Sequence, residues 1–307
     1  MRPLILLLAL ATPAAAQQAR APFTIAETGQ GFATLDEAVT AVRDNTATIL
    51  IAPGTYRQCT VQQGGVITFK AVQPGTVIFE NQVCEDKAAL VLRGRGSAVD
   101  GIIFRGYAVS DGNGAGIRIE MGDLLVTNSM FLDSQEGILG GGHETVRNIT
   151  IDRTTFSGLG QCETENCSHS IYLGLQGKVV VRNSRFERGT GGHYVKIRAP
   201  QVEIEDNSFD DSQGKGTNYM IDLSEGGAGL ITRNTFVQGP NKENSSGLIV
   251  VAAEARTYGS NGLTITDNVA SMAPGAPGNP AFVADLSRSQ IQLSGNRLTG
   301  MREFERR

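Results

Sequence analysis

The residues best suited to chemistry lie on two short segments of unusual polar composition. SHSIYLG carries His169 and Tyr172, and GGHYVKIRAP carries His193, Lys196 and Arg198. Imidazole, phenol, amine and guanidinium groups supply the proton transfers and the charge stabilisation that acid–base chemistry on an anionic ligand needs. The simpler interpretation is a solvated polar strip, because lysine and arginine are ordinary surface residues.

Alternation along these strands predicts which side chains share a face. Inward isoleucine, valine and leucine residues place Tyr172, Lys196 and Arg198 outward, and the next segment, NYMIDLSEGG, places Asp222 outward in the same way. His169 and His193 have the inward parity, but each begins a strand beside Gly or Ser, where a corner can turn it outward. Stacked segments would join all of these residues in one polar strip.

A repeat of phenylalanine after a turn predicts the elements that position this strip. TNSMF, DRTTF, RNSRF, DNSF and RNTF recur at intervals of about 23 to 30 residues, and each follows a short β-branched run such as ITI or VEIE. The rings stand at Phe131, Phe156, Phe186, Phe209 and Phe236. This period predicts an all-β solenoid, a single-stranded parallel β-helix whose equal positions stack into ladders, with asparagine in left-handed turns.

A solenoid grows by adding coils, so we expect residues 17–307 to form a single β-helix domain. Residues 1–16 have the features of a secretory signal peptide, namely Arg2, an apolar run and the small residues Ala14–Ala16. The apolar run is shorter than the roughly 20 residues of a membrane helix. We therefore expect a secreted or periplasmic protein without a membrane anchor.

Four cysteines in an exported chain are expected to pair. Cys59 and Cys84 are about one coil apart and could lie above one another, whereas Cys162 and Cys167 could close the loop QCETENC. We predict these two disulfides. A zinc site is the weaker interpretation, because the spacing of Cys162 and Cys167 does not suit one.

The segment at 34–44, TLDEAVTAVRD, predicts a short amphipathic helix. Thr34 and Glu37 form a capping box, and Leu35 and Val39 belong to its apolar face. Such a helix would cover the first open strand edges of the solenoid. Together with the following ILIAPGTY, it resembles the N-terminal entry of the pectin-lyase-like right-handed β-helix superfamily. The resemblance covers nearly the whole chain and implies a right-handed coil and a carbohydrate ligand, with lyases, hydrolases, epimerases and non-catalytic proteins among its members.

The polar segments also resemble a largely uncharacterised group of exported bacterial β-helix proteins with the patterns H-x-I-Y-x-G, G-H-x-x-K-S-R-A and Y-x-I-D-L-x-x-G-G. The matching residues are His169, Ile171, Tyr172, Gly174, Gly192, His193, Lys196, Arg198, Ala199, Tyr219, Ile221, Asp222, Leu223, Gly226 and Gly227. The chain departs at Ile197, where the group usually has serine. Ile197 has the inward parity, so the change should affect packing more than chemistry.

Charge favours an anionic ligand. The chain carries a net charge of −4, yet the segment 178–198 has six basic residues and only one acidic residue. A local basic surface suits an acidic polysaccharide, while the pI of about 5.5 and the scarcity of aromatic residues argue against nucleic acid.

We expect a monomer. We predict no cofactor, and calcium is not required, because acidic residues at turns are usually solvated. Those residues are Glu203, Glu205, Asp206, Asp210 and Asp211.

These observations favour a polysaccharide lyase that cleaves a uronate-containing chain by β-elimination. Arg198 would neutralise the uronate carboxylate, Lys196 would remove the C5 proton, and Tyr172 or His169 would protonate the leaving oxygen. His193 could exchange roles with either proton donor.

Two other functions stay open. A glycoside hydrolase would use paired carboxylates, for which Asp222, Glu225 and Glu254 are available. A non-catalytic carbohydrate-binding β-helix would use the same strip to hold an acidic glycan, with Tyr219, Asp222 and Glu254 among the binding residues.

Overall fold

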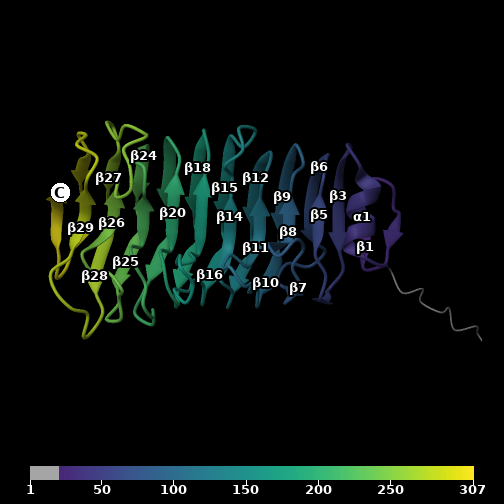
Figure 1. The fold of residues 1–307 in the computed structure, drawn as a ribbon, viewed down its shortest axis with the longest axis horizontal. Helices are drawn as coiled ribbons and strands as arrows, with labels where there is room; N and C mark the ends of the chain where they lie inside the picture. Colours follow the sequence, from purple (N-terminus) through teal and green to yellow (C-terminus); the bar gives the residue numbers. More distant parts are fainter. Residues whose placement is uncertain (1–20) are drawn as a thin grey trace, which may run out of the picture.

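The structure is a computed structural model that describes residues 21–307, so the expected signal peptide at 1–16 lies outside the described residues. Three long sheets wind along one axis, from the helix at one end to the C-terminal strand at the other (Figure 1). The strands within each sheet are parallel, except that β1 pairs antiparallel with β2 and β3. The all-β solenoid predicted from the repeat is confirmed.

The three sheets are called A, B and C. Sheet A contains β2 (Gly31–Phe32), β1 (Phe23–Ile25), β3 (Thr46–Ile51), β6 (Val66–Ala71), β9 (Gly96–Asp100), β12 (Asp123–Thr127), β15 (Asn148–Asp152), β18 (Lys178–Arg182), β21 (Gln201–Glu205), β24 (Ala228–Thr232), β27 (Thr264–Thr266) and β30 (Gln292–Ser294). Sheet B contains β4 (Gly54–Tyr56), β7 (Val77–Glu80), β10 (Ile102–Arg105), β13 (Met130–Leu132), β16 (Thr155–Ser157), β19 (Arg185–Glu187), β22 (Ser208–Asp210), β25 (Thr235–Gln238), β28 (Val269–Met272) and β31 (Arg297–Leu298). Sheet C contains β5 (Thr60–Gln62), β8 (Ala88–Leu92), β11 (Ala115–Ile119), β14 (Glu136–Gly140), β17 (Ile171–Gly174), β20 (Val195–Arg198), β23 (Ile221–Leu223), β26 (Gly247–Val251), β29 (Ala281–Asp285) and β32 (Arg302–Arg306).

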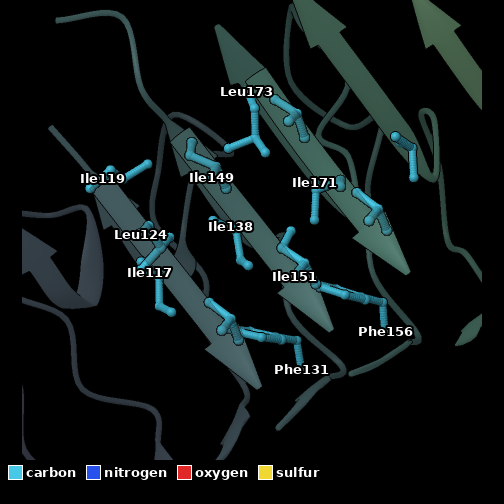
Figure 2. Packing of buried hydrophobic residues seen from close by; sticks show 14 of the residues in the cluster. Ile117, Ile119, Leu124, Phe131, Ile138, Ile149, Ile151, Phe156, Ile171 and Leu173 are labelled. Carbon is cyan, nitrogen blue, oxygen red and sulfur yellow. The ribbon is translucent and has the colours of Figure 1, made fainter. Parts of the chain in front are cut away.

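The phenylalanine repeat forms a continuous stack of buried rings in sheet B. The ring centroids of Phe131 and Phe156 (Figure 2) are 5.0 Å apart with nearly parallel planes. Those of Phe186 and Phe209 are 4.8 Å apart. The stack begins earlier than the repeat indicates, with Phe79 and Phe104, which follow no asparagine. Offset or parallel stacking of such rings adds to the apolar area that they bury.

The turn asparagines have two different structural roles. Asn128 and Asn183 adopt the predicted left-handed conformation, with φ of 51° at each. In the later coils the prediction is wrong, because the left-handed residue is Asp206 or Arg233 and the asparagine that follows is buried. In these later coils, Asn207, Asn234 and Asn268 form a ladder of side-chain amides. The Nδ2 of one asparagine donates to the Oδ1 of the next, at 2.9 Å between Asn207 and Asn234 and at 3.0 Å between Asn234 and Asn268. The ladder satisfies amide groups that would otherwise be buried without partners.

The helix α1 (Leu35–Val42) covers the N-terminal end of the coil, where it lies against β1, β3 and β5. Its predicted capping box is present: the Thr34 hydroxyl accepts from the Glu37 amide at 3.2 Å, and the Glu37 carboxylate accepts from the Thr34 amide at 3.0 Å.

Within residues 21–307, no helix is long and apolar enough to cross a membrane. Both predicted disulfides are present, with Cα atoms 5.5 Å apart for Cys59–Cys84 and 4.2 Å apart for Cys162–Cys167.

The ring stack predicts a large difference between two phenylalanine substitutions. Phe186 is fully buried between Phe156 and Phe209, so Phe186→Ala should lower the free energy of unfolding by about 3–5 kcal/mol. Phe304 in β32 is 37% exposed, and Phe304→Ala should cost about 1 kcal/mol or less. Urea unfolding measures both variants. Equal losses would contradict the view that the stack holds successive coils together.

Candidate active site on the outer face of sheet C

Register brings the predicted polar residues together on sheet C. Tyr172 in β17 pairs with Lys196 in β20, and Lys196 pairs with Asp222 in β23, so the three residues form one row across neighbouring coils. The row is less exposed than alternation alone predicts. The Lys196 side chain lies in a cleft and the residue is only 8% exposed, and Asp222 is 1% exposed. The expectation of a solvated strip is therefore wrong at both positions.

The burial of Asp222 has a local cause. The outer face of sheet C beyond it carries the small apolar cluster of Val250, Ala281 and Ala284, against which Tyr219 packs. Apolar contact on this face excludes water from the end of the row, so Tyr219 and Asp222 support the cleft wall and are not among the residues that line it.

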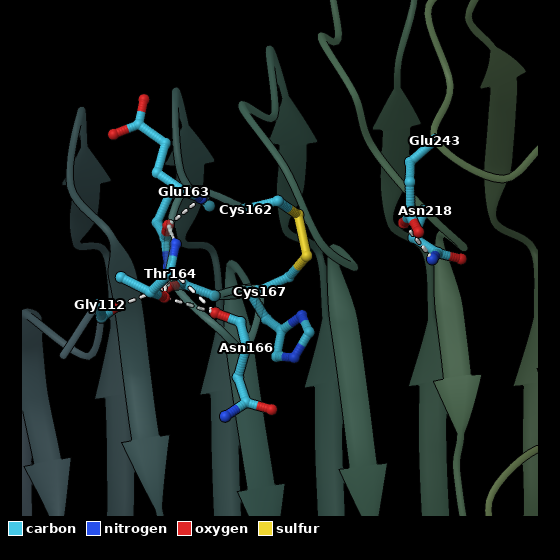
Figure 3. The surroundings of a disulfide bond; sticks show 12 residues. Gly112, Cys162, Glu163, Thr164, Asn166, Cys167, Asn218 and Glu243 are labelled. Atoms are coloured by element: carbon cyan, nitrogen blue, oxygen red, sulfur yellow. Dashed lines mark hydrogen bonds between the residues drawn. A yellow bond between two sulfur atoms is a disulfide. The ribbon is translucent and has the colours of Figure 1, made fainter.

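The cleft has a volume of about 500 Å³. Five of the predicted catalytic residues line it together with Glu254: His169, Tyr172, His193, Lys196 and Arg198. The disulfide Cys162–Cys167 closes a loop at its rim, where Asn166 and Cys167 face the cleft (Figure 3). Asn218 and Glu243 border the cleft from later coils, and the sequence patterns did not single out either residue.

A single carboxylate holds the two cations of the cleft. The Lys196 Nζ donates to Glu254 Oε1 at 2.6 Å, and the Arg198 guanidinium donates to the other oxygen, Oε2. Burial alone would raise the pKa of Glu254, but the hydrogen bonds from Lys196 and Arg198 outweigh burial and hold this pKa below its usual value. Arg198 also lies 3.3 Å from Glu225 Oε1 through its Nε. Two cations of the cleft, Lys196 and Arg198, therefore contact the same carboxylate.

Tyr172 forms the floor beneath both cations. The Lys196 Nζ lies 5.1 Å from the centroid of its ring, and the Arg198 Cζ lies 5.0 Å from it. Such cation–π contacts orient the cationic groups over the ring face. Burial raises the pKa of the Tyr172 phenol, so it carries its proton at neutral pH. A protonated phenol beside two cations is a suitable general acid.

Two histidines stack beside these residues. The rings of His169 and His193 are 4.9 Å apart, and the ring of Tyr219 lies 5.2 Å beyond His193. The Nδ1 of His169 accepts from the His193 amide at 3.0 Å, and the Nδ1 of His193 accepts from the Tyr219 amide at 3.1 Å. An accepting Nδ1 carries no proton, so each neutral ring holds its proton on Nε2.

The environment keeps both histidines neutral. Burial is the main cause, and the nearby charge of Lys196 adds to it, so the pKa of His169 lies well below its usual value and that of His193 falls to about 3. A neutral imidazole donates a hydrogen bond from Nε2 but gives up that proton reluctantly. The arrangement therefore favours Tyr172 over His169 or His193 as the group that protonates a leaving oxygen.

Two buried carboxyl groups lie next to the cations. Burial raises the pKa of Asp222 to about 6, although the Ser224 hydroxyl donates to it at 2.6 Å. Burial also raises the pKa of Glu136 well above its usual value. Glu136 lines the cleft, yet the sequence patterns missed it because its segment, SQEGILG, has ordinary composition. Counting one coil back from His169 would have found it.

The basic segment 178–198 does not form one basic surface. The winding of the coil sends Lys178 to sheet A, Arg185 to sheet B and Lys196 to sheet C, and Lys178 and Arg185 pair with acidic neighbours. The expectation of a single basic patch is wrong, because consecutive strands face different directions. Only the end of this segment contributes cations to the cleft.

The acidic residues considered for calcium are tied to cations of adjacent coils. Arg233 pairs with Glu205 at 2.8 Å and with Asp206 at 2.7 Å, while Asp211 is buried with Lys242 at 3.1 Å. Within residues 21–307, no group of three or more His, Cys, Asp or Glu side chains is arranged to hold a metal ion.

The sequence matches the family described as the right handed beta helix region over residues 76–302. The chain belongs to the right-handed β-helix family. No curated protein sequence matches it. Among solved structures, an alginate lyase from Paenibacillus sp. str. FPU-7 is similar with a TM-score of 0.62 and 14% identity, covering 88% of this chain and 94% of that one.

A second similar structure is the PL6 family alginate lyase AlyGC, with a TM-score of 0.53 and 14% identity over 87% of this chain. This chain spans only 39% of the length of AlyGC. A pectin methylesterase from Aspergillus niger has a TM-score of 0.49 and 10% identity, covering 90% of this chain and 85% of that one. At 14% identity, the likeness to the two alginate lyases shows the right-handed β-helix fold alone, which the superfamily resemblance implied.

The hydrogen bonds at Nδ1 predict the behaviour of the two cleft histidines in solution. Both rings should stay neutral, with the proton on Nε2, as the pH falls to about 5, which is below the ordinary histidine pKa. Histidine side-chain ¹⁵N NMR across a pH titration measures the protonation state and the tautomer. A ring that gains a second proton near its ordinary pKa would show that the amide-to-Nδ1 bonds do not form.

Proposed function

We propose that this protein is an exported polysaccharide lyase that cleaves a uronate-containing polysaccharide by β-elimination. One observation carries the proposal: Lys196 and Arg198 converge on the carboxylate of Glu254, inside a cleft floored by Tyr172. A uronate carboxylate has the same charge and geometry, so it can take the place of Glu254 between the two cations. The two disulfides fit export to an oxidising compartment.

The proposed reaction assigns one step to each residue. Arg198 binds the uronate carboxylate and stabilises the charge that develops when the C5 proton leaves. Lys196, in its neutral amine form, removes that proton, and Tyr172 donates its phenolic proton to the glycosidic oxygen as the C4–O bond breaks. A C4–C5 double bond forms in the product, and the proton then on Lys196 returns to the tyrosinate, directly or through water.

Displacement of Glu254 explains how Lys196 can act as a base. In the empty cleft, the Lys196 Nζ donates to Glu254 Oε1 at 2.6 Å. A substrate carboxylate that engages Arg198 releases Glu254 from the pair. The substrate carboxylate then lies between Lys196 and Arg198, and Lys196 acts as the base after one of its protons has passed to water.

The similarity to alginate lyases supports the proposal at the level of fold only, and it selects alginate as the first polymer to test. The hydrolase alternative needs two carboxyl groups that face one another across the scissile bond. Glu225 and Glu254 both contact the Arg198 guanidinium, and Asp222 is buried behind the cleft wall. This arrangement is less suited to hydrolysis than to binding a carboxylate.

Substitutions of the three assigned residues should abolish turnover while the fold persists. Lys196→Ala, Arg198→Ala and Tyr172→Phe should each reduce the rate about 10²- to 10⁴-fold, the usual contribution of a catalytic acid, base or charge stabiliser. The rate is followed by the ultraviolet absorbance of the unsaturated product from polymannuronate, polyguluronate and polygalacturonate. New reducing ends without that absorbance would indicate a hydrolase instead.

Lys178→Ala is the matched control for Lys196→Ala. Lys178 also pairs with a glutamate, Glu203, but it lies on sheet A, away from the cleft. The Lys178→Ala variant should keep most of the activity. Full activity of Lys196→Ala on a polymer that the wild type cleaves would remove Lys196 from the mechanism.

A further inference from the structure

We propose that Glu136 is a protonated carboxylic acid that donates a hydrogen bond to the carboxylate of a bound acidic glycan, and so helps the cleft to select an anionic substrate. This inference rests on the proposed function for the class of ligand. It adds a residue to the site that neither the sequence patterns nor the three assigned steps include.

The position of Glu136 places it at the bottom of the cleft. It begins β14, one coil before β17, and its Oε1 accepts from the His169 amide at 3.2 Å. Glu136 is 1% exposed and lines the same cleft as Tyr172 and Lys196. The carboxyl group is therefore held by the backbone of the neighbouring coil, beside the residues that bind the carboxylate of Glu254.

One oxygen of this carboxyl group is left without a partner. Among the described residues, no group within hydrogen-bonding distance satisfies Glu136 Oε2, and no cation lies within ion-pair distance of the carboxyl group. A buried polar atom without a partner costs about 1–3 kcal/mol, so its presence in a cleft points to a partner supplied by a ligand. Oε2 is free to carry the proton and to donate it in a hydrogen bond.

The surrounding groups do not make Glu136 ionise. The charged and titratable groups that face it are Arg118 from β11, His169 just before β17, Tyr172 from β17, and Lys196 from β20. Burial raises the pKa of Glu136 well above 4.5, and the His169 amide and the charges of Arg118 and Lys196 oppose burial without overcoming it. Burial thus favours the neutral carboxyl group, which is a hydrogen-bond donor.

The protonated state decides which ligand the cleft accepts. An ionised carboxylate at the bottom of the cleft would repel a uronate carboxylate bound by Lys196 and Arg198. A protonated one instead adds a neutral donor to the two cations and leaves their charge uncompensated, so a carboxylate is favoured over a neutral sugar hydroxyl. Deprotonation at high pH should therefore weaken the binding of an acidic glycan.

Glutamine is the informative replacement because Glu136→Gln keeps a neutral donor and an acceptor at every pH. In a Tyr172→Phe background that prevents turnover, calorimetry should measure the affinity for mannuronate and guluronate oligosaccharides from about pH 5 to about pH 9. The affinity of the parent should fall about 10-fold or more toward the alkaline end, as a lost hydrogen bond to a charged group predicts. The affinity of the Glu136→Gln protein should stay constant over the same range.

Thermal unfolding of the same proteins, without glycan, tests the protonated state separately. A carboxyl group whose pKa is raised in the folded protein contributes stability below its unfolded pKa, and this stability is lost as the pH rises through the folded pKa. The melting temperature of Glu136→Gln should therefore exceed that of its parent by a margin that grows with pH. Glu203→Gln, the same change in sheet A, is the control and should leave glycan affinity and its pH profile unchanged.

The outcomes separate this inference from the proposed function. Binding with the expected pH profile by a wild type that produces no unsaturated ends would overturn the lyase proposal and support the role of Glu136. A melting-temperature margin that does not depend on pH would show that Glu136 is ionised and would overturn the inference. Two results would overturn the contact between Glu136 and the glycan. In the first, the melting-temperature margin depends on pH, but the parent and the Glu136→Gln protein show the same pH profile of glycan affinity. In the second, the parent binds neither oligosaccharide.

Discussion

Parallel, in-register pairing of each coil with the next is the constraint on which the rest of this structure depends. Strands of adjacent coils lie about 4.8 Å apart, so a side chain at one position stands directly over its counterpart in the previous coil. Phe156 above Phe131 in sheet B and Lys196 beside Tyr172 in sheet C are consequences of the same rule. The pairing that builds the core also assembles the cleft.

Charge in the cleft is balanced by a small number of carboxyl groups in different protonation states. Glu254 is ionised and holds Lys196 and Arg198, whereas burial favours the neutral form of Glu136. The neutral histidines add donors without adding charge. An anionic ligand can therefore exchange with Glu254 and meet two cations and several neutral donors.

Sequence periodicity predicted the features that depend on local pattern and stacking. The phenylalanine stack, the capping helix and the two disulfides follow from spacing alone, because each depends on residues in one segment or one coil apart. The row of Tyr172, Lys196 and Asp222 followed from alternation. The burial of Asp222 did not, because it depends on the apolar side chains of the later strands β26 and β29 and on Tyr219. The placement of Glu254 on two cations did not, because it depends on the path of a turn after β26 that has no periodic signal. Glu136 was missed because nothing in its own segment marks it as unusual.

The position of a bound uronate carboxylate would show whether Lys196 and Arg198 bind the substrate. A crystal structure of the Tyr172→Phe protein with a mannuronate or guluronate oligosaccharide would locate that group. One uronate carboxylate should lie between Lys196 and Arg198, in the place that Glu254 occupies in the empty cleft. A glycan bound on sheet A or sheet B, or bound in the cleft while Glu254 still holds both cations, would contradict it.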